Sequence, residues 1–310
     1  MAALHQSVLY QEALDALAIR QNGFYVDGTF GRGGHSRGVL EALGAKGHLL
    51  AFDRDIEAIN SPQANALKQD ERFNLHHGCF VELDTVCRQL GWAGKVDGIL
   101  LDLGVSSPQL DFAERGFSFL REGPLDMRMD TTKGLSAAGY LAQVDEQDLV
   151  NVLFEFGEER FARRIAKAIV EQRKIAAIET TLQLAKLVEQ VVPFKEKHKH
   201  PATRTFQAIR IEINQELEQI KMVLEQAADM LAPGGRLVVI AFHSLEDRIV
   251  KRFIRTESGR KTNPGRLPIK EDAIERGRLK KIGQSTRAQE AELKQNPRAR
   301  SAVMRVAEKI

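Results

Sequence analysis

Residues 25–36, YVDGTFGRGGHS, place an acidic residue at the end of an apolar run and follow it with a turn rich in glycine. The acid is Asp27, and the glycines are Gly31, Gly33 and Gly34. Because glycine has no side chain and tolerates dihedral angles that other residues avoid, such a turn lets a ligand approach the main chain closely. Asp53 ends the next apolar run and is placed to accept hydrogen bonds from ribose hydroxyls. The two features together predict a pocket for a ribose-containing ligand.

Two classes of ligand compete for this pocket. A dinucleotide fingerprint requires G-x-G-x-x-G, and here the register gives Gly31, Gly33 and then Ser36, so the third glycine is missing. The run D-x-x-x-G-x-G-G instead resembles the first motif of S-adenosylmethionine-dependent methyltransferases of the Rossmann-like class. In that class the turn cradles the methionine moiety, and the acid after the second strand binds the ribose. S-adenosyl-L-methionine is therefore the expected cofactor, and a tight turn that binds no ligand is the alternative.

A third polar group follows a later apolar run. Asp102 ends that run, and Ser106, Ser107 and Pro108 come next. In amino-group methyltransferases this position carries a motif of the form Asn/Asp/Ser-Pro-Pro-aromatic, whose acceptors hold the N–H bonds of an exocyclic amine and aim its lone pair at the methyl group. Catalysis of that kind depends mainly on positioning, with charge stabilised where it develops. We expect Ser106, Ser107 and Pro108 to orient the target amine.

The motif departs from that pattern after Pro108. Gln109 and Leu110 stand where the second proline and the aromatic residue would be. Stacking on a flipped base would then come from another aromatic side chain. The nearby candidates, for which core packing is the alternative, are Phe112, Phe117 and Phe119.

The order of elements along the chain shows how these residues would meet. Strand-like runs at 23–30, 48–55, 72–78 and 96–107 alternate with helical runs. This alternation predicts a doubly wound parallel sheet, with a ligand site beyond the carboxyl ends of its strands. Residues 105–135 predict a loop, and residues 136–192 carry apolar residues at helical spacing without a strand. Strand patterns return at 236–242 and at 300–309.

The predicted fold class is therefore α/β, a Rossmann-like class I S-adenosylmethionine methyltransferase core with an inserted helical domain. We expect the first part of the core at 1–105 and a helical substrate-recognition insertion at 106–210. The second part of the core, with a basic C-terminal segment, is expected at 211–310.

The composition restricts the functional classes. The 310 residues are 43% hydrophobic, as in globular proteins, and no apolar run is long enough to span a membrane. Cys79 and Cys87 form no disulfide framework or metal signature, and the N-terminus shows no signal peptide, so we expect a cytoplasmic protein. Between Arg248 and Arg300, sixteen Lys or Arg stand against six Asp or Glu, although the net charge of the chain is only +3. This asymmetry predicts a polyanionic partner, with a solvated arm as the alternative.

Two further clusters are polar. The run KEKHKHPATRTFQAIR contains cations suited to bind phosphate, namely Lys195, Lys197, Lys199, Arg204 and Arg210. His198 and His200 have no accompanying Cys or acidic ligand set, so we expect no metal site. In FHSLEDR, Ser244 and Asp247 have the spacing of a capping box, and His243 is a candidate RNA contact.

Long motifs along the chain resemble the RsmH (MraW) family, the bacterial small-subunit ribosomal RNA cytosine-N4 methyltransferases. The motifs that carry this resemblance include DGTFGRGGHS, AFDRD, LLDLGVSSPQLD, GEERFARRIA, HPATRTFQAIRI and FHSLEDRIVKRF. The match extends from His5 to Arg305. The resemblance implies methylation of one cytidine in the decoding centre of 16S rRNA, which is the expected partner. Because a target base within folded RNA must be presented unstacked, the small ribosomal subunit is an expected form of the substrate, and naked rRNA is the alternative.

The resemblance also implies the residues that contact the cofactor. Asp53 would hold the ribose, Phe80 would lie near the adenine, and Asp102 and Gln109 would flank the methionine end. The full set is Gly33, Gly34, His35, Asp53, Phe80, Asp102 and Gln109.

Two rival functions stay open. One is a methyltransferase with the same core that acts on a small molecule or a protein. The other is a non-catalytic RNA-binding or ribosome-assembly factor that has kept a cofactor pocket. The sequence also leaves the oligomeric state open, a homodimer included.

Overall fold

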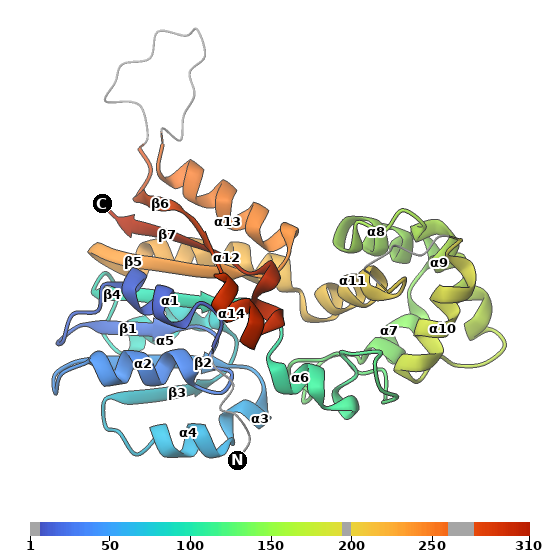
Figure 1. The fold of residues 1–310 in the computed structure, drawn as a ribbon, viewed down its shortest axis with the longest axis horizontal. Helices are drawn as coiled ribbons and strands as arrows, with labels where there is room; N and C mark the ends of the chain where they lie inside the picture. The colour runs from blue at the N-terminus through green and yellow to red at the C-terminus, as the bar shows by residue number, and fades with distance from the viewer. Residues whose placement is uncertain (1–6, 194–199, 260–275) are drawn as a thin grey trace, which may run out of the picture. The chain divides into compact units, whose positions relative to one another are not determined.

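The chain forms two compact units. The computed structural model describes residues 7–193, 200–259 and 276–310 (Figure 1). The first unit combines Met1–Gly104 with Leu217–Ile310, and the second is the continuous segment Val105–Glu216. The second unit is therefore an insertion in the sequence of the first.

A seven-stranded sheet forms the centre of the first unit. Its strands are β1 (Phe24–Asp27), β2 (His48–Asp53), β3 (Phe73–His77), β4 (Val96–Asp102), β5 (Leu231–Ala241), β6 (Leu279–Arg287) and β7 (Val303–Lys309). Their order is β3-β2-β1-β4-β5-β7-β6; β1 to β5 pair in parallel, whereas β7 is antiparallel to both neighbours. The predicted α/β fold with a parallel central sheet is confirmed, and β7 adds an antiparallel strand to it. The order reverses between β1 and β4, which is where open sheets of this kind bind ligands.

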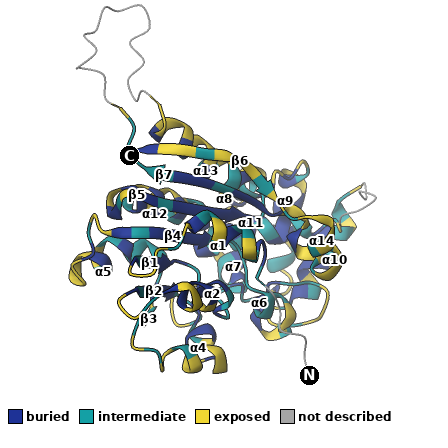
Figure 2. Ribbon diagram, turned by 60° about the vertical axis from the view of Figure 1, so that its left-hand side comes forward, coloured by how far each residue is buried: buried dark blue, intermediate teal, exposed yellow. Residues whose placement is uncertain are grey.

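The two faces of the sheet carry separate hydrophobic cores. Val26 and Leu50 point to the core that α5, α12 and α13 cover, whereas Tyr25 and Leu49 point to the core beneath α1 and α2. Neighbouring residues of a strand alternate between the faces, so a strand buried on both sides is apolar throughout. Figure 2 shows the central strands as buried.

The helices of the first unit flank this sheet. They are α1 (Tyr10–Leu17), α2 (Gly34–Ala42), α3 (Ile56–Ile59), α4 (Pro62–Leu67), α5 (Leu83–Gln89), α12 (Glu216–Met230, whose first residue belongs to the second unit), α13 (Ser244–Glu257) and α14 (Glu290–Gln295). Among the described residues, no helix combines the length and the apolar character that crossing a membrane requires.

Two strands differ from the sequence-based expectation. β5 begins at Leu231, five residues before the predicted run, because Leu231 pairs with Val96 before the register shifts to Gly98 and Arg236. β6 was not predicted, because it is an edge strand with mostly exposed polar side chains and therefore lacks an apolar period. The C-terminal strand, β7, was predicted and is present.

The second unit is helical, as predicted. Its helices are α6 (Ser107–Asp111), α7 (Ala137–Gln143), α8 (Glu146–Gly157), α9 (Ala162–Arg173), α10 (Thr181–Val191) and α11 (Thr203–Asn214). Short helical segments, α6 and the 3-10 turn Ala113–Arg115, interrupt the stretch that was expected to be a loop throughout.

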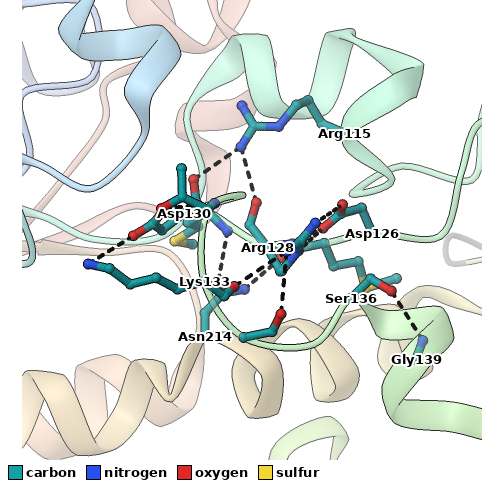
Figure 3. Close-up of polar contacts among 12 residues, drawn as sticks. Arg115, Asp126, Arg128, Asp130, Lys133, Ser136, Gly139 and Asn214 are labelled. Carbon is teal, nitrogen blue, oxygen red and sulfur yellow. Dashed lines mark hydrogen bonds and ion pairs between the residues drawn. The ribbon is translucent and has the colours of Figure 1, made fainter.

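Buried polar side chains hold the loop between α6 and α7 (Figure 3). Arg115 is 4% exposed, and its Nη2 donates to the carbonyls of Arg128 and Met129 at 3.1 and 3.2 Å. Asn214, at the end of α11, accepts from the Met129 N–H and donates to the Met127 carbonyl, both at 2.8 Å. The loop is thus ordered by side chains that replace the missing regular main-chain bonds.

Replacing Asn214 by Ala tests this role. The change leaves the buried N–H of Met129 and the carbonyl of Met127 without their partner, so we expect the free energy of unfolding to fall by about 2–4 kcal/mol. The only tryptophan, Trp92, lies in the first unit, so unfolding should be followed by far-UV circular dichroism and by hydrogen exchange of residues 115–136. Asn151→Ala, at an exposed position of α8, is the control. Equal stability of the two variants would contradict the stabilising role of the Asn214 hydrogen bonds.

Candidate functional site

Three acidic residues end three adjacent strands. Asp27 ends β1, Asp53 ends β2 and Asp102 ends β4, and β1 lies between the other two strands. Because these strands are parallel, their carboxyl ends meet at one edge of the sheet. The sequence-based expectation that these residues lie close together follows directly from this topology.

Asp27 closes the turn that follows β1. It is 1% exposed, its Oδ2 accepts from Ser36 Oγ at 2.7 Å, and its Oδ1 accepts from the Thr29 N–H at 3.0 Å. Thr29 in turn uses its hydroxyl to accept the main-chain N–H of Asp102 at 2.7 Å. Asp27 therefore orients the turn from inside the protein, and Thr29 ties the turn to β4. Sequence reasoning missed Thr29, because the bond to Asp102 joins residues far apart in the chain.

Neighbouring residues of the protein restrict the side chains that the glycine positions of this turn could carry. Gly33 precedes α2 with φ +72°, and a Cβ there would lie 2.8 Å from the Phe30 ring and 2.9 Å from Leu67. A Cβ on Gly34 would lie within 2.1 Å of Ser7 Oγ. Gly33 therefore requires glycine because of its positive φ and its close neighbours, and a side chain at position 34 would require Ser7 to move.

Asp53 holds the glycine turn and stays partly exposed. Its Oδ2 accepts from the Gly31 N–H at 2.7 Å, and its Oδ1 accepts from the Asp55 N–H at 2.8 Å. Burial raises the pKa of Asp53 to about 7, although these two N–H groups lower it, and the charges of Asp55 and Asp27 raise it further. A carboxyl group with these properties can accept hydrogen bonds from the hydroxyl groups of a sugar at the rim of the site.

Asp102 and His35 form a pair of titratable groups at the same edge of the sheet. His35, in the first turn of α2, is 4% exposed, and its Nδ1 lies 3.7 Å from Asp102 Oδ2. Burial raises the pKa of Asp102 well above its usual value, as do the charges of Asp27 and Glu246, and burial lowers the pKa of His35. Asp102 Oδ1 is buried and has no hydrogen-bond partner among the described residues. A cationic ligand group would supply the missing counter-charge.

Phe80 lies on the β3 side of this edge. It begins a 3-10 turn (Phe80–Glu82) directly after β3 and packs partly buried against the core. Two residues earlier, the Gly78 N–H donates to the main-chain carbonyl of Asp53 at 2.9 Å. The ring is thus held near the residue that was expected to bind the ribose.

Ser106, Ser107, Pro108 and Gln109 belong to the second unit and form the beginning of α6. Ser106 is the N-cap residue, and its main-chain N–H donates to Gln109 Oε1 at 2.9 Å. Gln109 is 5% exposed. The local role of both side chains is to order the helix start.

The three aromatic candidates differ in how far their side chains are exposed. Phe117 is 6% exposed, and Phe119 packs against His200 and Phe206 with ring centroids 4.5 and 4.9 Å away, so both serve the core of the second unit. Phe112, at the end of α6, is 47% exposed. Only Phe112 among the three candidates is therefore open to a substrate.

The start of α13 corrects one sequence-based prediction. His243, and not Ser244, is the N-cap residue, and Glu246, and not Asp247, completes the capping box. Glu246 is fully buried and accepts the main-chain N–H groups of Phe242 and His243 at 2.7 and 3.1 Å. Asp247 instead binds Arg305 at 2.6 and 2.9 Å. The helix begins one residue earlier than predicted, which moves the capping pair by one position.

The predicted phosphate-binding run is only partly described. Lys195, Lys197, His198 and Lys199 lie outside the described residues. His200 forms an ion pair with Glu189 at 3.1 Å, and Arg210 binds both oxygens of Glu216 at 2.8 Å. The guanidinium of Arg210 therefore already has an anionic partner within the protein.

Comparison with known proteins identifies the family. Residues 2–310 match the model of the MraW methylase family. The chain is 57% identical over 309 residues to ribosomal RNA small subunit methyltransferase H of Thioalkalivibrio sulfidiphilus. The aligned residues cover 100% of this chain and 98% of that protein. The corresponding protein of Alteromonas mediterranea is 55% identical over 307 residues, which covers 99% and 97% of the two chains. Among solved structures, an rRNA methylase from Streptococcus thermophilus is similar with a TM-score of 0.41 and 14% identity, covering 99% of each chain. The resemblance that the sequence motifs carry is confirmed, and the chain belongs to the MraW methylase family.

Proposed function

We propose that this protein methylates small-subunit ribosomal RNA with S-adenosyl-L-methionine, and that its target is the exocyclic N4 of a cytidine in the decoding centre of 16S rRNA. The observation that carries the proposal is the pair of carboxyl groups, Asp53 and Asp102, on either side of the glycine turn. The names of the relatives, ribosomal RNA small subunit methyltransferases, support the substrate class. Such a reaction belongs in the cytoplasm.

The residues present fit the cofactor. Asp53 would accept the ribose hydroxyls and Phe80 would lie against the adenine. His35 and Asp102 would face the methionine end, with the main chain of Gly33 and Gly34 beside it. Asp102 Oδ1, buried without a partner among the described residues, suits a positively charged ligand. The cofactor supplies a methyl group on a sulfonium, which is already a reactive donor.

Orientation of the amine is then the main task of the protein. The lone pair of the N4 amine is delocalised into the cytosine ring, so the amine is a poor nucleophile until its N–H bonds are held. We assign this role to the oxygens of Ser106 and Ser107 and to the turn at Pro108, which follow Asp102 closely in the chain. Gln109, which orders this turn, is the residue that the family resemblance assigns to the methionine end of the cofactor.

Methyl transfer to isolated small subunits tests the proposed function. Purified protein is incubated with radiolabelled S-adenosylmethionine and with small subunits from a strain that lacks this methyltransferase, and the rRNA is digested to nucleosides. We expect the label in N4-methylcytidine. Label in protein, in a small molecule or in another base would overturn the assignment.

The rival assembly factor makes a different prediction. For an assembly factor, replacing Asp53 should leave subunit assembly unchanged, because cofactor binding would be incidental. For a methyltransferase, the same change should abolish transfer while RNA affinity stays nearly intact. Subunit assembly, methyl transfer and RNA affinity are therefore measured for Asp53→Asn to separate the two functions.

The raised pKa of Asp53 predicts a pH dependence of cofactor binding. Below pH 7 the carboxyl group of the free protein binds a proton and loses an acceptor for the ribose hydroxyls. The affinity for S-adenosylhomocysteine should therefore fall about tenfold between pH 8 and pH 6. Isothermal titration calorimetry measures this, and Asp53→Asn should bind weakly with a flat profile. Glu41→Gln, at an exposed acid of α2, should keep the slope of the unaltered protein.

Phe112 is expected to stack on RNA. Phe112→Ala should lower kcat/KM for the small subunit about tenfold, since stacking on an aromatic ring contributes roughly 1–3 kcal/mol per base, whereas Phe112→Trp should retain activity. Phe154→Ala is the matched control, because Phe154 is 65% exposed on α8 of the same unit. Equal effects of Phe112→Ala and Phe154→Ala, or none from either, would contradict the assignment.

A further inference from the structure

α13 has two faces of opposite character. Its apolar face packs into the core with Leu245 buried and with Val250 and Ile254 in the cluster beneath it. Its outer face carries four exposed cations at positions i, i+3, i+4 and i+7, namely Arg248, Lys251, Arg252 and Arg255. Side chains at these positions share one side of a helix, so the four charges form a continuous stripe.

The neighbouring edge strand extends this stripe. In β6, Leu279 belongs to the same core as Val250 and Ile254, and Lys281 stands two residues further along the strand. Residues two apart share a face of the sheet, so Lys281 lies on the α13 side and is exposed. Figure 2 shows β6 as a largely exposed strand at the edge of the sheet beside α13. We call Arg248, Lys251, Arg252, Arg255 and Lys281 the α13 basic face.

The acidic side chains around this face have partners of their own. Asp247 binds Arg305, and Glu257 binds Arg278 at 2.9 Å. Arg278 also binds Glu225 and Asp229 of α12. Among the residues that the structure describes, no ion pair involves Lys251, Arg252, Arg255 or Lys281. The positive charge of these four side chains is therefore not neutralised by an ion pair within the described residues.

The stripe opposes the stability of the helix that carries it. Arg248 and Arg252, and likewise Lys251 and Arg255, are like charges four residues apart, an arrangement that destabilises helices. No acidic side chain on the outer face of α13 relieves the repulsion between Lys251 and Arg255, since Glu246 and Glu257 are buried and Asp247 is bound to Arg305. Folding alone gives no reason for Lys251, Arg252 and Arg255, so a ligand is the better explanation.

The face also leads to the candidate site within the same unit. α13 follows β5 after a short turn, and Ile240 of β5 pairs with Asp102 of β4. The first turn of α13 thus begins at the sheet edge that carries Asp102. We call the carboxyl ends of β1, β2 and β4, where the cofactor is proposed to bind, the cofactor edge. A polyanion lying along α13 would have one end there.

We propose that the α13 basic face binds the phosphate backbone of the RNA substrate and delivers the strand to the cofactor edge. The proposal rests on the proposed function for the identity of the polyanion. An anionic membrane is the other class of partner for a basic helix, but membrane binding needs an apolar face free to enter the lipid. The apolar face of α13 is buried in the core, which favours RNA.

A triple variant, Lys251→Gln/Arg252→Gln/Arg255→Gln, tests the proposal. Binding to a 16S rRNA transcript and to purified small subunits is measured by filter binding between about 50 and 200 mM KCl. We expect affinity at the lower salt to fall on the order of tenfold or more, and the slope of log K against log salt to shrink by about 2–3. Thermal stability should stay equal or rise, because the change removes repulsion. At saturating subunits, kcat of methyl transfer should be kept while KM rises.

The control variant removes the same charge elsewhere in the first unit. Arg37→Gln/Lys46→Gln/Lys95→Gln replaces three exposed cations outside α13 and β6. An equal loss of affinity in the control would overturn the proposal, because net charge alone would then explain binding. An unchanged slope in the α13 variant would overturn it too, while methyl transfer to RNA by the unaltered protein would leave the proposed function standing. Loss of binding to phosphatidylserine vesicles, with RNA binding unchanged, would assign the face to a membrane instead.

Discussion

The turn after β1 is the constraint on which the cofactor edge depends. Asp27 closes this turn by accepting from Thr29 and Ser36, and Thr29 accepts the N–H of Asp102. On the other side, the Gly31 N–H binds the carboxyl group of Asp53. One short segment therefore fixes the ends of three strands relative to one another. Loosening it would move both carboxyl groups at once.

This arrangement brings acidic groups together at an electrostatic cost. Burial and neighbouring carboxylates raise the pKa values of Asp53 and Asp102. Isolated acidic groups of this kind weaken a fold, but a ligand with hydroxyl groups and a positive charge satisfies them. A cofactor that carries a ribose and a sulfonium matches both requirements. The charges at this edge therefore support the proposed cofactor, which agrees with membership of a methylase family.

The second unit contains a long loop, between α6 and α7, that no sheet orders. Arg115 and Asn214 do this from buried positions, by bonding to the main chain around Met127 and Met129. The aromatic side chains nearby divide between core packing and exposure, and Phe112 is the exposed one. In the first unit, the outer face of α13 has no comparable internal role. The surfaces that we propose for recognition of a large anionic substrate therefore contribute little to folding.

The sequence by itself determined the parallel core and the three acids at its edge. Apolar runs that alternate with helical periods predict such a sheet, and the end of each run marks the end of a strand, so Asp27, Asp53 and Asp102 could be located without coordinates. It did not reveal β6, because an exposed edge strand needs no apolar period. Only the tertiary structure decided that His243 and Glu246 cap α13, that Ser7 lies beside Gly34, and that Phe112 is exposed while Phe117 is buried. Each of these depends on contacts between residues distant in the chain or on the exact helix start, which local periodicity does not encode.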